Sequence, residues 1–405
     1  MVAQFSSRIL LFFPIIFTLL TMAALTYSIL IFRAARAYSL ASRIVPPAFY
    51  PSVSILKPVK GVDPEMYAAF ASHCRQNYPG EYEILFGVHS MEDAAVGAVQ
   101  RLQQEFPSQN IRIIVCQEIL GTNGKVSNLV QMVEHARFDH LLINDSDIHV
   151  SPHYLSRVMP SFGQPEKAAN PVGMVTALYR GRSQATLGSR LEALGISTDF
   201  MPGVLTSRWL EKGVHFGLGS TLAFTRQALD AIGGLLPLAD HLADDYELGA
   251  RISKAGFRVE LAREVVETSV PAYTFRQFLT HQLRWARGIR DARPLGYFGL
   301  LVTFGIPWAL ANVMASAASL DSIALLSCML CVRIAVALTI GAEIIRDRNV
   351  IRDVWLLPFR DCIALGIWFW SYADTHVIWR GERFLLSKGK LTRQGKESGV
   401  PDSRS

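Results

Sequence analysis

Residues 9–32 form an almost unbroken apolar run, and this run constrains the fold of the chain more than any other feature. A helix of about 20 apolar residues is long enough to cross the hydrocarbon core of a bilayer. A cleaved signal peptide is the alternative, but the run exceeds the usual signal core and no small-residue cleavage site follows it. Three arginines follow instead, so residues 1–45 are predicted to anchor the chain with the next segment in the cytoplasm: Arg33, Arg36 and Arg43.

Composition points to further membrane segments near the other end of the chain. Half of the residues are hydrophobic and the mean hydropathy is +0.24, which is high for a wholly soluble protein. Within residues 295–379, segments 297–318 and 323–345 are predicted to span the membrane. Segment 354–379 carries three charged residues, and spanning, re-entrant and interfacial placements all stay open for it. Residues 380–405 are predicted to be a basic, partly disordered cytosolic tail.

The net charge of +6 and the sequence pI near 9.1 indicate an anionic partner. Much of the positive excess lies beside apolar runs and in the tail, which favours the lipid bilayer over nucleic acid. The aromatic residues are not interleaved with basic ones as in nucleic-acid-binding faces. Five scattered cysteines form no disulfide framework, which agrees with a reducing cytosol for the main domain.

Residues 46–294 alternate between strand-like and helix-like segments. Strands are predicted at 52–56, 82–88, 111–115 and 141–143, and helices at 64–76, 94–106 and 126–136. This alternation predicts an α/β domain in which helices cover both faces of a mostly parallel sheet. In such sheets ligands bind at the carboxyl ends of the strands, where Asp93, Asp145 and Asp147 fall.

Asp145 and Asp147 are separated by one residue, directly after the buried strand 141–143. Side chains alternate along a strand, so both carboxylates are expected on the same side. Two acids so close repel each other and need a cation. Mg²⁺ or Mn²⁺ suits oxygen ligands and often keeps positions open for substrate phosphates. A solvated Asp-Ser-Asp turn is the alternative interpretation of these residues alone.

Three other segments carry candidate site residues. Gly121–Lys125 is a polar turn before a helix that includes Asn128, and exposed amides with a lysine suit a phosphate. Asp244 and Asp245 open a helix, where acids are also ordinary helix-dipole residues. Residues 275–289 fit an amphipathic helix in the membrane interface, and they include His281, Arg284 and Trp285.

Most of the chain resembles a membrane-bound, inverting glycosyltransferase of family 2 type. More closely, it is similar to the ceramide glucosyltransferase family and its bacterial relatives, the hopanoid-biosynthesis-associated glycosyltransferases. The resemblance implies a GT-A type nucleotide-sugar-binding sheet with flanking helices. The motifs that carry it are Ile55–Asp63, Glu92–Ala95, Gly121–Leu129, Asp145-Ser146-Asp147, Leu242–Tyr246, His281-x-x-Arg284-Trp285 and Trp379–Phe384.

The resemblance also implies roles for single residues. Asp93 is expected to bind the base or ribose of the nucleotide, and Asp145 with Asp147 to hold the metal on the UDP diphosphate. Asp245 is expected to be the general base that deprotonates the acceptor hydroxyl. Two further sets are implied, one binding the nucleotide sugar and one lying near the diphosphate and acceptor: Lys125 and Asn128, and His281, Arg284 and Trp285. His281 departs from the Gln or Arg usual at its position, so that residue's role does not transfer directly.

The predicted function is transfer of one sugar from a UDP-sugar to a membrane lipid hydroxyl with inversion. N-acetylglucosamine transfer to a hopanoid, bacteriohopanetetrol, is the preferred interpretation, and glucose transfer to ceramide is the alternative. A processive polysaccharide synthase is disfavoured by the few helices after the catalytic domain and by His281. An inactive nucleotide-sugar-binding membrane protein is the alternative from another class. A bacterial inner membrane with a cytoplasmic catalytic domain is the predicted location.

Overall fold

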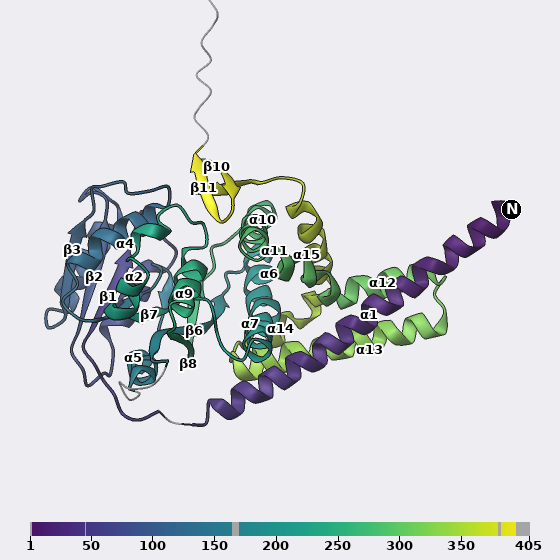
Figure 1. Ribbon diagram of the computed structural model, residues 1–405, viewed down its shortest axis with the longest axis horizontal. Coiled ribbons are helices and arrows are strands. Elements are labelled where there is room, and N and C mark those ends of the chain that lie inside the picture. The colour runs from purple at the N-terminus through teal and green to yellow at the C-terminus, as the bar shows by residue number, and fades with distance from the viewer. Residues whose placement is uncertain (1, 45, 164–169, 380–381, 394–405) are drawn as a thin grey trace, which may run out of the picture.

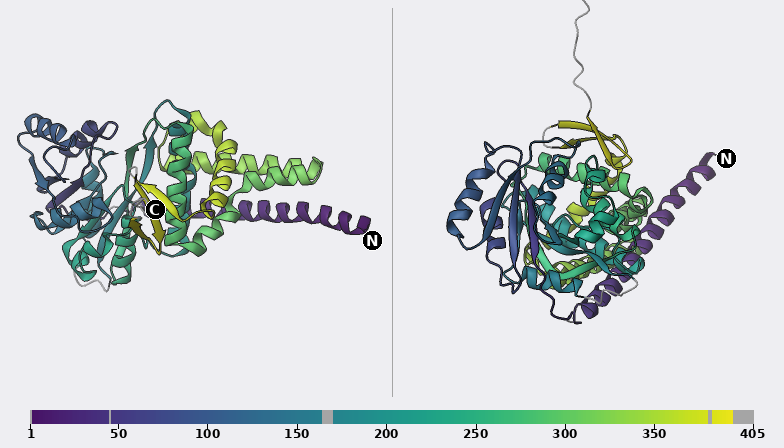
Figure 2. Two further views of the ribbon diagram at one scale, coloured as in Figure 1. Left: turned by 90° about the horizontal axis from the view of Figure 1, so that it is seen from above. Right: turned by 60° about the vertical axis from the view of Figure 1, so that its left-hand side comes forward.

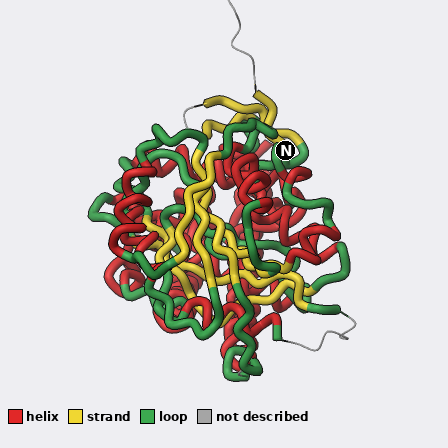
Figure 3. The backbone as a smooth tube through the Cα atoms, turned by 90° about the vertical axis from the view of Figure 1, so that its left-hand side faces the viewer, coloured by secondary structure: helices red, strands yellow, loops and turns green. Residues whose placement is uncertain are grey.

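The computed structural model describes residues 2–44, 46–163, 170–379 and 382–393. An eight-stranded sheet forms the centre of the main domain, in the order β3-β2-β1-β4-β7-β6-β8-β5. Helices lie on both sides of it (Figure 3). The strands are β1 (Val53–Pro58), β2 (Tyr82–Val88), β3 (Asn110–Val115), β4 (His140–Ile143), β5 (Ile148–His149), β6 (Val172–Arg182), β7 (Leu222–Thr225) and β8 (Arg258–Ser269).

The first half of the sheet is parallel, as the alternation of elements predicts. β1 pairs in parallel with both β2 and β4, and β2 pairs in parallel with β3. β7 is antiparallel to β4 and to β6, so the whole sheet is mixed. The predicted α/β sheet with flanking helices is confirmed. The helices of this domain are α2 (Met66–Cys74), α3 (Ala95–Glu105), α4 (Gly124–Glu134), α5 (Tyr154–Val158), α6 (Leu187–Gly195), α7 (Met201–Leu210), α8 (Arg226–Ala231), α9 (Asp244–Lys254) and α10 (Phe275–Ala292).

The N-terminal helix α1 (Val2–Ala41) is longer than the predicted anchor. Its part Phe12–Ala41 is long and apolar enough to cross a membrane. In Figure 1 it runs away from the sheet beside α12 (Gly305–Ala315) and α13 (Leu320–Val336), and Figure 2 shows the same projection from above. Its last turns are different, because Ile31, Ala34 and Tyr38 belong to the main hydrophobic core. The helix therefore joins the candidate membrane span directly to the main domain.

Of the two membrane spans predicted near the C-terminus, one is found as a single helical segment and the other is not. Leu320–Ile344 is a second candidate span, formed by α13 and the π-helix η5 (Ala337–Ile344). The predicted span 297–318 is instead a pair of helices, Pro294–Thr303 and Gly305–Ala315, bent by 51°. The bend falls just before Pro307, which has no backbone N–H to continue the preceding helix. α11 (Pro294–Gly299) and α14 (Asn349–Asp353) complete this region with α15.

Segment 354–379, left open from the sequence, divides into a helix and a strand. α15 (Leu357–Ser371) is shorter than the candidate spans, and it buries Arg360 and Asp361. β9 (His376–Trp379) then pairs with β10 (Glu382–Ser387), which pairs with β11 (Lys390–Arg393). Within the tail that is predicted to be partly disordered, residues 382–393 are ordered, because Phe384, Leu386 and Leu391 share a small core with Val377. The rest of the predicted tail lies outside the described residues.

Candidate active site

The acid pair lies directly after β4, in contact with the end of β1. Lys57 of β1 is fully buried, and its Nζ donates a hydrogen bond of 3.2 Å to the backbone carbonyl of Asp145. Burial lowers the pKa of Lys57 to about 7, although the charges of Asp147 and Asp145 oppose that shift. The acid pair therefore rests on a buried amine that can carry a positive charge.

Asp147 is the inner member of the pair. The hydroxyl of Thr268 donates a hydrogen bond to its Oδ2. Burial and then the charge of Asp145 raise the pKa of Asp147 to about 6. Asp145 is more open, with 42% of its side chain exposed. Both carboxylates are therefore partly exposed, Asp145 more clearly so, and a nearby cation would favour the ionised form of Asp147.

These two carboxylates fit a divalent cation. Among the described residues no group of three His, Cys, Asp or Glu side chains is arranged to hold a metal ion. A hard cation on two carboxylates keeps further positions for water and phosphate oxygens, and the raised pKa of Asp147 indicates a pair short of positive charge. Asp145 and Asp147 are therefore the residues that would hold the ion.

Lys125 connects the acid pair to the start of α9. Asn123 caps α4 by accepting hydrogen bonds from the backbone N–H groups of Lys125 and Val126, which fixes the first turn of the helix. Lys125 Nζ lies 2.8 Å from Asp145 Oδ1 and 3.2 Å from Asp244 Oδ2. Burial would lower the pKa of this amine, but the nearby carboxylates hold it well above its usual range. Lys125 is thus a fixed cation at the predicted phosphate turn.

Asp245 faces the same space as Asp145. Its Oδ2 accepts a hydrogen bond of 2.8 Å from the backbone N–H of Gly219, and its Oδ1 accepts one from Tyr246. A Cβ added at Gly219 would lie 2.9 Å from Asp245 Oδ2 and 3.4 Å from Asp145 Oδ2. Burial and then the charge of Asp244 raise the pKa of Asp245 to about 6. A carboxylate with such a pKa suits a general base near neutral pH.

Asp93 and Asn128 lie at the neighbouring strand ends. Asp93 Oδ1 accepts hydrogen bonds of 2.9 Å from the backbone N–H groups of Gly61 and Ala95, so it ties the loop after β1 to the start of α3. Asn128 Nδ2 donates to the carbonyl of Gly87 at 3.4 Å. Both residues border the carboxyl edge of β1 and β2, where a nucleotide would lie.

His281 and Trp285 lie on α10, and their contacts are with other elements than those that carry the aspartates described above. His281 Nδ1 lies 3.1 Å from Glu192 Oε1 of α6. Gln282 donates a hydrogen bond of 2.8 Å to the other oxygen of that carboxylate. The ring of Trp285 lies 5.4 Å from the ring of His281 and 5.9 Å from that of Phe200. These contacts attach α10 to α6 and to the following π-helix η2 (Ile196–Phe200).

Arg284 lies on the same helix, near Tyr273. Burial and then the charge of Glu192 raise the pKa of Tyr273 to about 12, and the charge of Arg284 opposes this shift. Tyr179 connects this group with the acids, because burial and the charges of Asp245 and Glu192 raise its pKa well above the usual range. The charges of Asp245 and of Glu192, the partner of His281 on α10, thus act on the same buried tyrosine, Tyr179.

Three residues of this site carried no role in the sequence analysis. Lys57 is the one cation in an apolar strand, which is a signal that could have been used. Asp244 was interpreted with Asp245 as a helix-start acid, although it pairs with Lys125. Glu192 is 3% exposed and stands among apolar residues of α6. A single acid in an apolar helix is the only signal for it, since its partners lie about 90 residues away.

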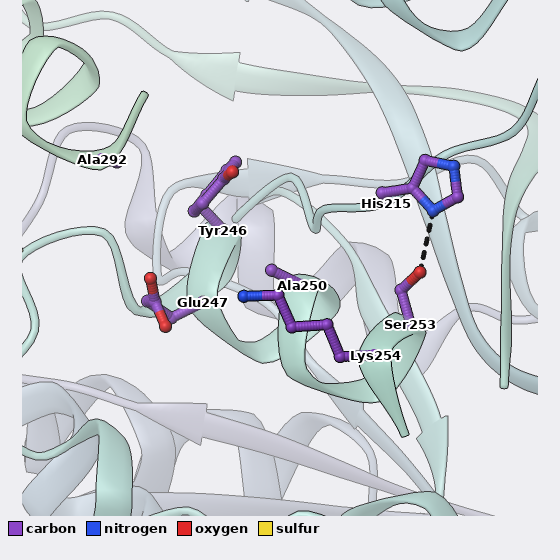
Figure 4. Close-up of a pocket in the computed structure, with 7 residues that line it drawn as sticks. All are labelled: His215, Tyr246, Glu247, Ala250, Ser253, Lys254 and Ala292. Carbon is purple, nitrogen blue, oxygen red and sulfur yellow. Dashed lines mark hydrogen bonds between the residues drawn. The ribbon is translucent and has the colours of Figure 1, made fainter. Parts of the chain in front are cut away.

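A cavity of about 380 Å³ lies on another face of α9 (Figure 4). It is lined by His215, Tyr246, Glu247, Ala250, Ser253, Lys254 and Ala292. His215 Nδ1 lies 2.8 Å from the hydroxyl of Ser253, and the ring of Phe216 stacks on that of Tyr246 at 6.2 Å. None of the residues predicted to be catalytic or to bind the nucleotide sugar lines this cavity. The candidate active site is therefore the cluster formed by the aspartates and Lys125.

Together, the mixed α/β sheet, the acids at its strand ends and the adjoining apolar helices are the features expected of a membrane-associated glycosyltransferase. The chain belongs to glycosyl transferase family 21, whose model matches residues 16–392. The predicted resemblance to the ceramide glucosyltransferase family is thereby confirmed.

Curated relatives are named ceramide glucosyltransferases. Ceramide glucosyltransferase 1 of Caenorhabditis elegans is 26% identical over 250 residues, which cover 62% of this chain and 52% of the relative. Ceramide glucosyltransferase of Komagataella phaffii is 35% identical over 117 residues, covering 28% and 23%. The chain thus matches about half the length of the first of these. Among solved structures, the mannosyltransferase PcManGT from Pyrobaculum calidifontis in complex with GDP-Man and Mn²⁺ has a TM-score of 0.49 at 18% identity, covering 87% of this chain and 99% of that one.

Proposed function

We propose that this protein transfers glucose from UDP-glucose to the hydroxyl of ceramide, with inversion at the anomeric carbon. The observation that carries the proposal is the convergence of Asp145 and Asp245 on Gly219, with Lys125 bound to Asp145. The similarity to ceramide glucosyltransferases favours ceramide over the hopanoid acceptor preferred from the sequence. N-acetylglucosamine transfer to a hopanoid has no support from these relatives.

Asp145 and Asp147 would hold the divalent ion, Mg²⁺ or Mn²⁺. When bound, the ion neutralises charge that develops on the leaving diphosphate. Lys125 adds a fixed positive charge at the same place, since its ammonium is already held by Asp145 and Asp244. We assign Asp93 and Asn128 to the nucleoside side of the donor, because they border the ends of β1 and β2.

Asp245 is the proposed base. Its pKa of about 6 leaves the carboxylate ionised at neutral pH and still able to accept a proton from the attacking hydroxyl. Attack by that hydroxyl on the face opposite the leaving diphosphate gives single displacement and inversion. We assign Arg284 to the diphosphate or the acceptor, with His281 and Trp285 as the residues that orient its helix.

The acceptor reaches this site from the bilayer. The two candidate spans project from the body of the protein on the side of α10 and α15 (Figure 1). Three arginines follow the first apolar run, so we place the catalytic domain on the cytoplasmic side: Arg33, Arg36 and Arg43. We further propose a bacterial inner membrane as the location. A lipid hydroxyl at the membrane interface then lies near the base without leaving the bilayer.

A transfer assay on the full chain in lipid nanodiscs tests the proposal. UDP-glucose with ceramide is expected to give glucosylceramide only when Mg²⁺ or Mn²⁺ is present. UDP-N-acetylglucosamine with bacteriohopanetetrol is the second arm, and product in that arm alone would overturn the ceramide assignment. Asp245→Asn is expected to bind UDP-glucose and to lose transfer. If the wild type binds UDP-glucose but forms no product in either arm, the inactive binding protein becomes the better explanation.

A further inference from the structure

The C-terminal sheet is docked on the loop that leads into the proposed base. The backbone N–H of Leu391 donates a hydrogen bond of 2.7 Å to the carbonyl of Asp240, and that of Leu242 donates one of 3.0 Å to the carbonyl of Gly389. His241 and Lys390 form an antiparallel bridge between these bonds. Residues 239–243, here called the base loop, are therefore joined to the start of β11 by one antiparallel bridge.

The same loop is bonded on its other side to the predicted phosphate turn. Both the N–H and the hydroxyl of Thr122 donate hydrogen bonds of 2.9 Å to Asp240 Oδ1. The N–H of Asn123 donates to the carbonyl of Ala239 at 2.7 Å, and its side chain donates to the carbonyl of His241 at 2.8 Å. Asn123 also caps the helix of Lys125. The base loop therefore lies between the phosphate turn and the hairpin formed by β10 and β11.

The hairpin has a third attachment, to α10. The N–H of Gly389 donates a hydrogen bond to Asp291, near the end of that helix. Gly389 has a positive φ of 79°, which glycine adopts without strain, and it lies against the ring of His241. Arg287 donates a hydrogen bond to the carbonyl of His376 in β9. The helix that carries His281 and Arg284 and the loop that leads into Asp245 are thus joined through one small sheet.

We propose that this C-terminal sheet is a positioning element of the active site. It holds the base loop, and the loop sets the start of α9 with Asp244 and Asp245 against the turn that carries Asn123 and Lys125. Asp245 follows the base loop directly in the chain. If the hairpin detaches from the loop, the loop is free to move, and the base is then misplaced relative to the donor. The inference rests on the proposed function for the identity of the base.

Docking of the hairpin is held by few interactions, so it is sensitive to single changes. The core that the hairpin shares with the loop is small, consisting of Leu242 against Val377, Phe384, Leu386 and Leu391. His241 Nδ1 is buried and is one of three such side-chain atoms without a hydrogen-bond partner among the described residues. An unpaired buried polar atom opposes docking. Loss of one backbone hydrogen bond is therefore expected to release the loop.

Leu391 offers a matched pair of variants. Leu391→Pro and Leu391→Ala both remove the buried side chain, but only proline removes the N–H that bonds to Asp240. The measurements are amide hydrogen exchange over residues 239–245, and kcat and KM for UDP-glucose, all on the full chain in nanodiscs. Thr392→Ala, at an exposed position of the same strand, is the control and is expected to match the wild type.

We expect Leu391→Pro to exchange faster in the base loop than Leu391→Ala and to lower kcat about tenfold further. KM for UDP-glucose is expected to change by less than about threefold, since the donor contacts remain. Equal kcat in both variants, with faster exchange in Leu391→Pro, would overturn the inference while leaving the proposed function in place. If the wild type forms no glucosylceramide, the proposed function fails, and equal loop exchange in both variants would then overturn the positioning role separately.

A second variant keeps the test decisive if Leu391→Pro does not fold. Asp291→Ala removes the acceptor of the Gly389 N–H from outside the hairpin, and Asp291→Asn retains an acceptor oxygen. Asp291→Ala is expected to lower kcat and accelerate exchange at residues 239–243, with Asp291→Asn restoring most of both. Wild-type kcat in Asp291→Ala would count against the positioning role, because the hairpin would then be dispensable.

Discussion

The backbone N–H of Gly219 lies 2.8 Å from Oδ2 of Asp245, the proposed base. This contact aims the carboxylate at Asp145, whose Oδ2 would lie 3.4 Å from a Cβ at position 219. Glycine is required there by space and not by backbone conformation, since a positive φ is not recorded at this position. The space between the proposed base and the proposed metal-binding acid is therefore kept open by the absence of a side chain at position 219.

Gly219→Ala is predicted to lower kcat by about 10- to 100-fold, because the new methyl group displaces Asp245 from its hydrogen bond. The measurement is the steady-state transfer rate with saturating UDP-glucose. Gly203→Ala is the control, since nothing lies within 4 Å of its added Cβ. Equal losses in both variants would show that space at Gly219 is not what limits the rate.

The pH dependence of transfer is predicted to have a steep acid limb. The pKa of Asp245 is raised to about 6, and its carboxylate must be ionised to accept a proton. The rate is therefore lost as pH falls through about 6, by about tenfold per pH unit below that pKa. A pH profile of kcat/KM between pH 4.5 and 8 is the measurement. A limb centred near the ordinary pKa of aspartate would contradict this assignment.

Asp244→Asn is predicted to extend activity to more acidic pH. The charge of Asp244 is the second cause of the raised pKa of Asp245, after burial. Removing that charge lowers the pKa of the base, so its ionised form persists at lower pH. Lys125 keeps its contact with Asp145 in this variant. The acid limbs of wild type and variant, measured in the same buffers, should differ in this direction, and an upward shift would exclude the proposed coupling.

His281→Gln is predicted to retain most activity, whereas His281→Leu is predicted to lose about tenfold. His281 contacts Glu192, which is 3% exposed, and a glutamine amide can donate to that carboxylate as the imidazole does. Leucine leaves one oxygen of a buried carboxylate without this partner, which costs about 1–3 kcal/mol. Transfer rates and thermal inactivation of both variants are the measurements. Equal behaviour of the two would remove the Glu192 contact as the reason for a polar residue here.

Local sequence pattern was sufficient for the parallel half of the sheet. Apolar strand segments alternate with amphipathic helices there, and β1, β2, β3 and β4 pair as predicted. A strand was expected at residues 222–224, but the antiparallel pairing of β7 was not predicted, because its partner β4 lies about 80 residues earlier. The C-terminal hairpin was not predicted either. Its charged composition resembles a tail, and its apolar residues find a core only beside Leu242.

The candidate site shows the same division between local and distant contacts. The spacing of Asp145 and Asp147 predicted that they lie on one side, and the polar turn before α4 predicted Lys125 as a phosphate-binding residue, which the structure places 2.8 Å from Asp145. The links between Asp244 and Lys125 and between Glu192 and His281 join residues about 90 to 120 positions apart. The hydrophobic periodicity of the sequence cannot predict such pairs, because each residue alone is an ordinary helix-start acid or a buried polar residue.

The ion pair between Arg333 and Asp361 explains how a candidate span tolerates an arginine. Arg333 Nε lies 2.8 Å from Asp361 Oδ2, and its Nη2 donates to Oδ1 at 3.0 Å. A third bond of 2.9 Å runs to the carbonyl of Thr198, within the π-helix η2. Both side chains are nearly buried, at 12% and 9% exposure, so each charge depends on the other.

Arg333→Met is therefore predicted to lower stability strongly, by about 3–5 kcal/mol, because it removes the bidentate partner of the buried Asp361 and leaves only Arg360, at 3.9 Å. The double variant Arg333→Met/Asp361→Leu is predicted to recover a large part of that loss, since it removes both buried charges together. Thermal inactivation of the purified chain in nanodiscs, compared across both single variants and the double variant, measures the coupling. Additive losses in the double variant would show that the two side chains stabilise the membrane region independently, and the bidentate contact would then contribute little.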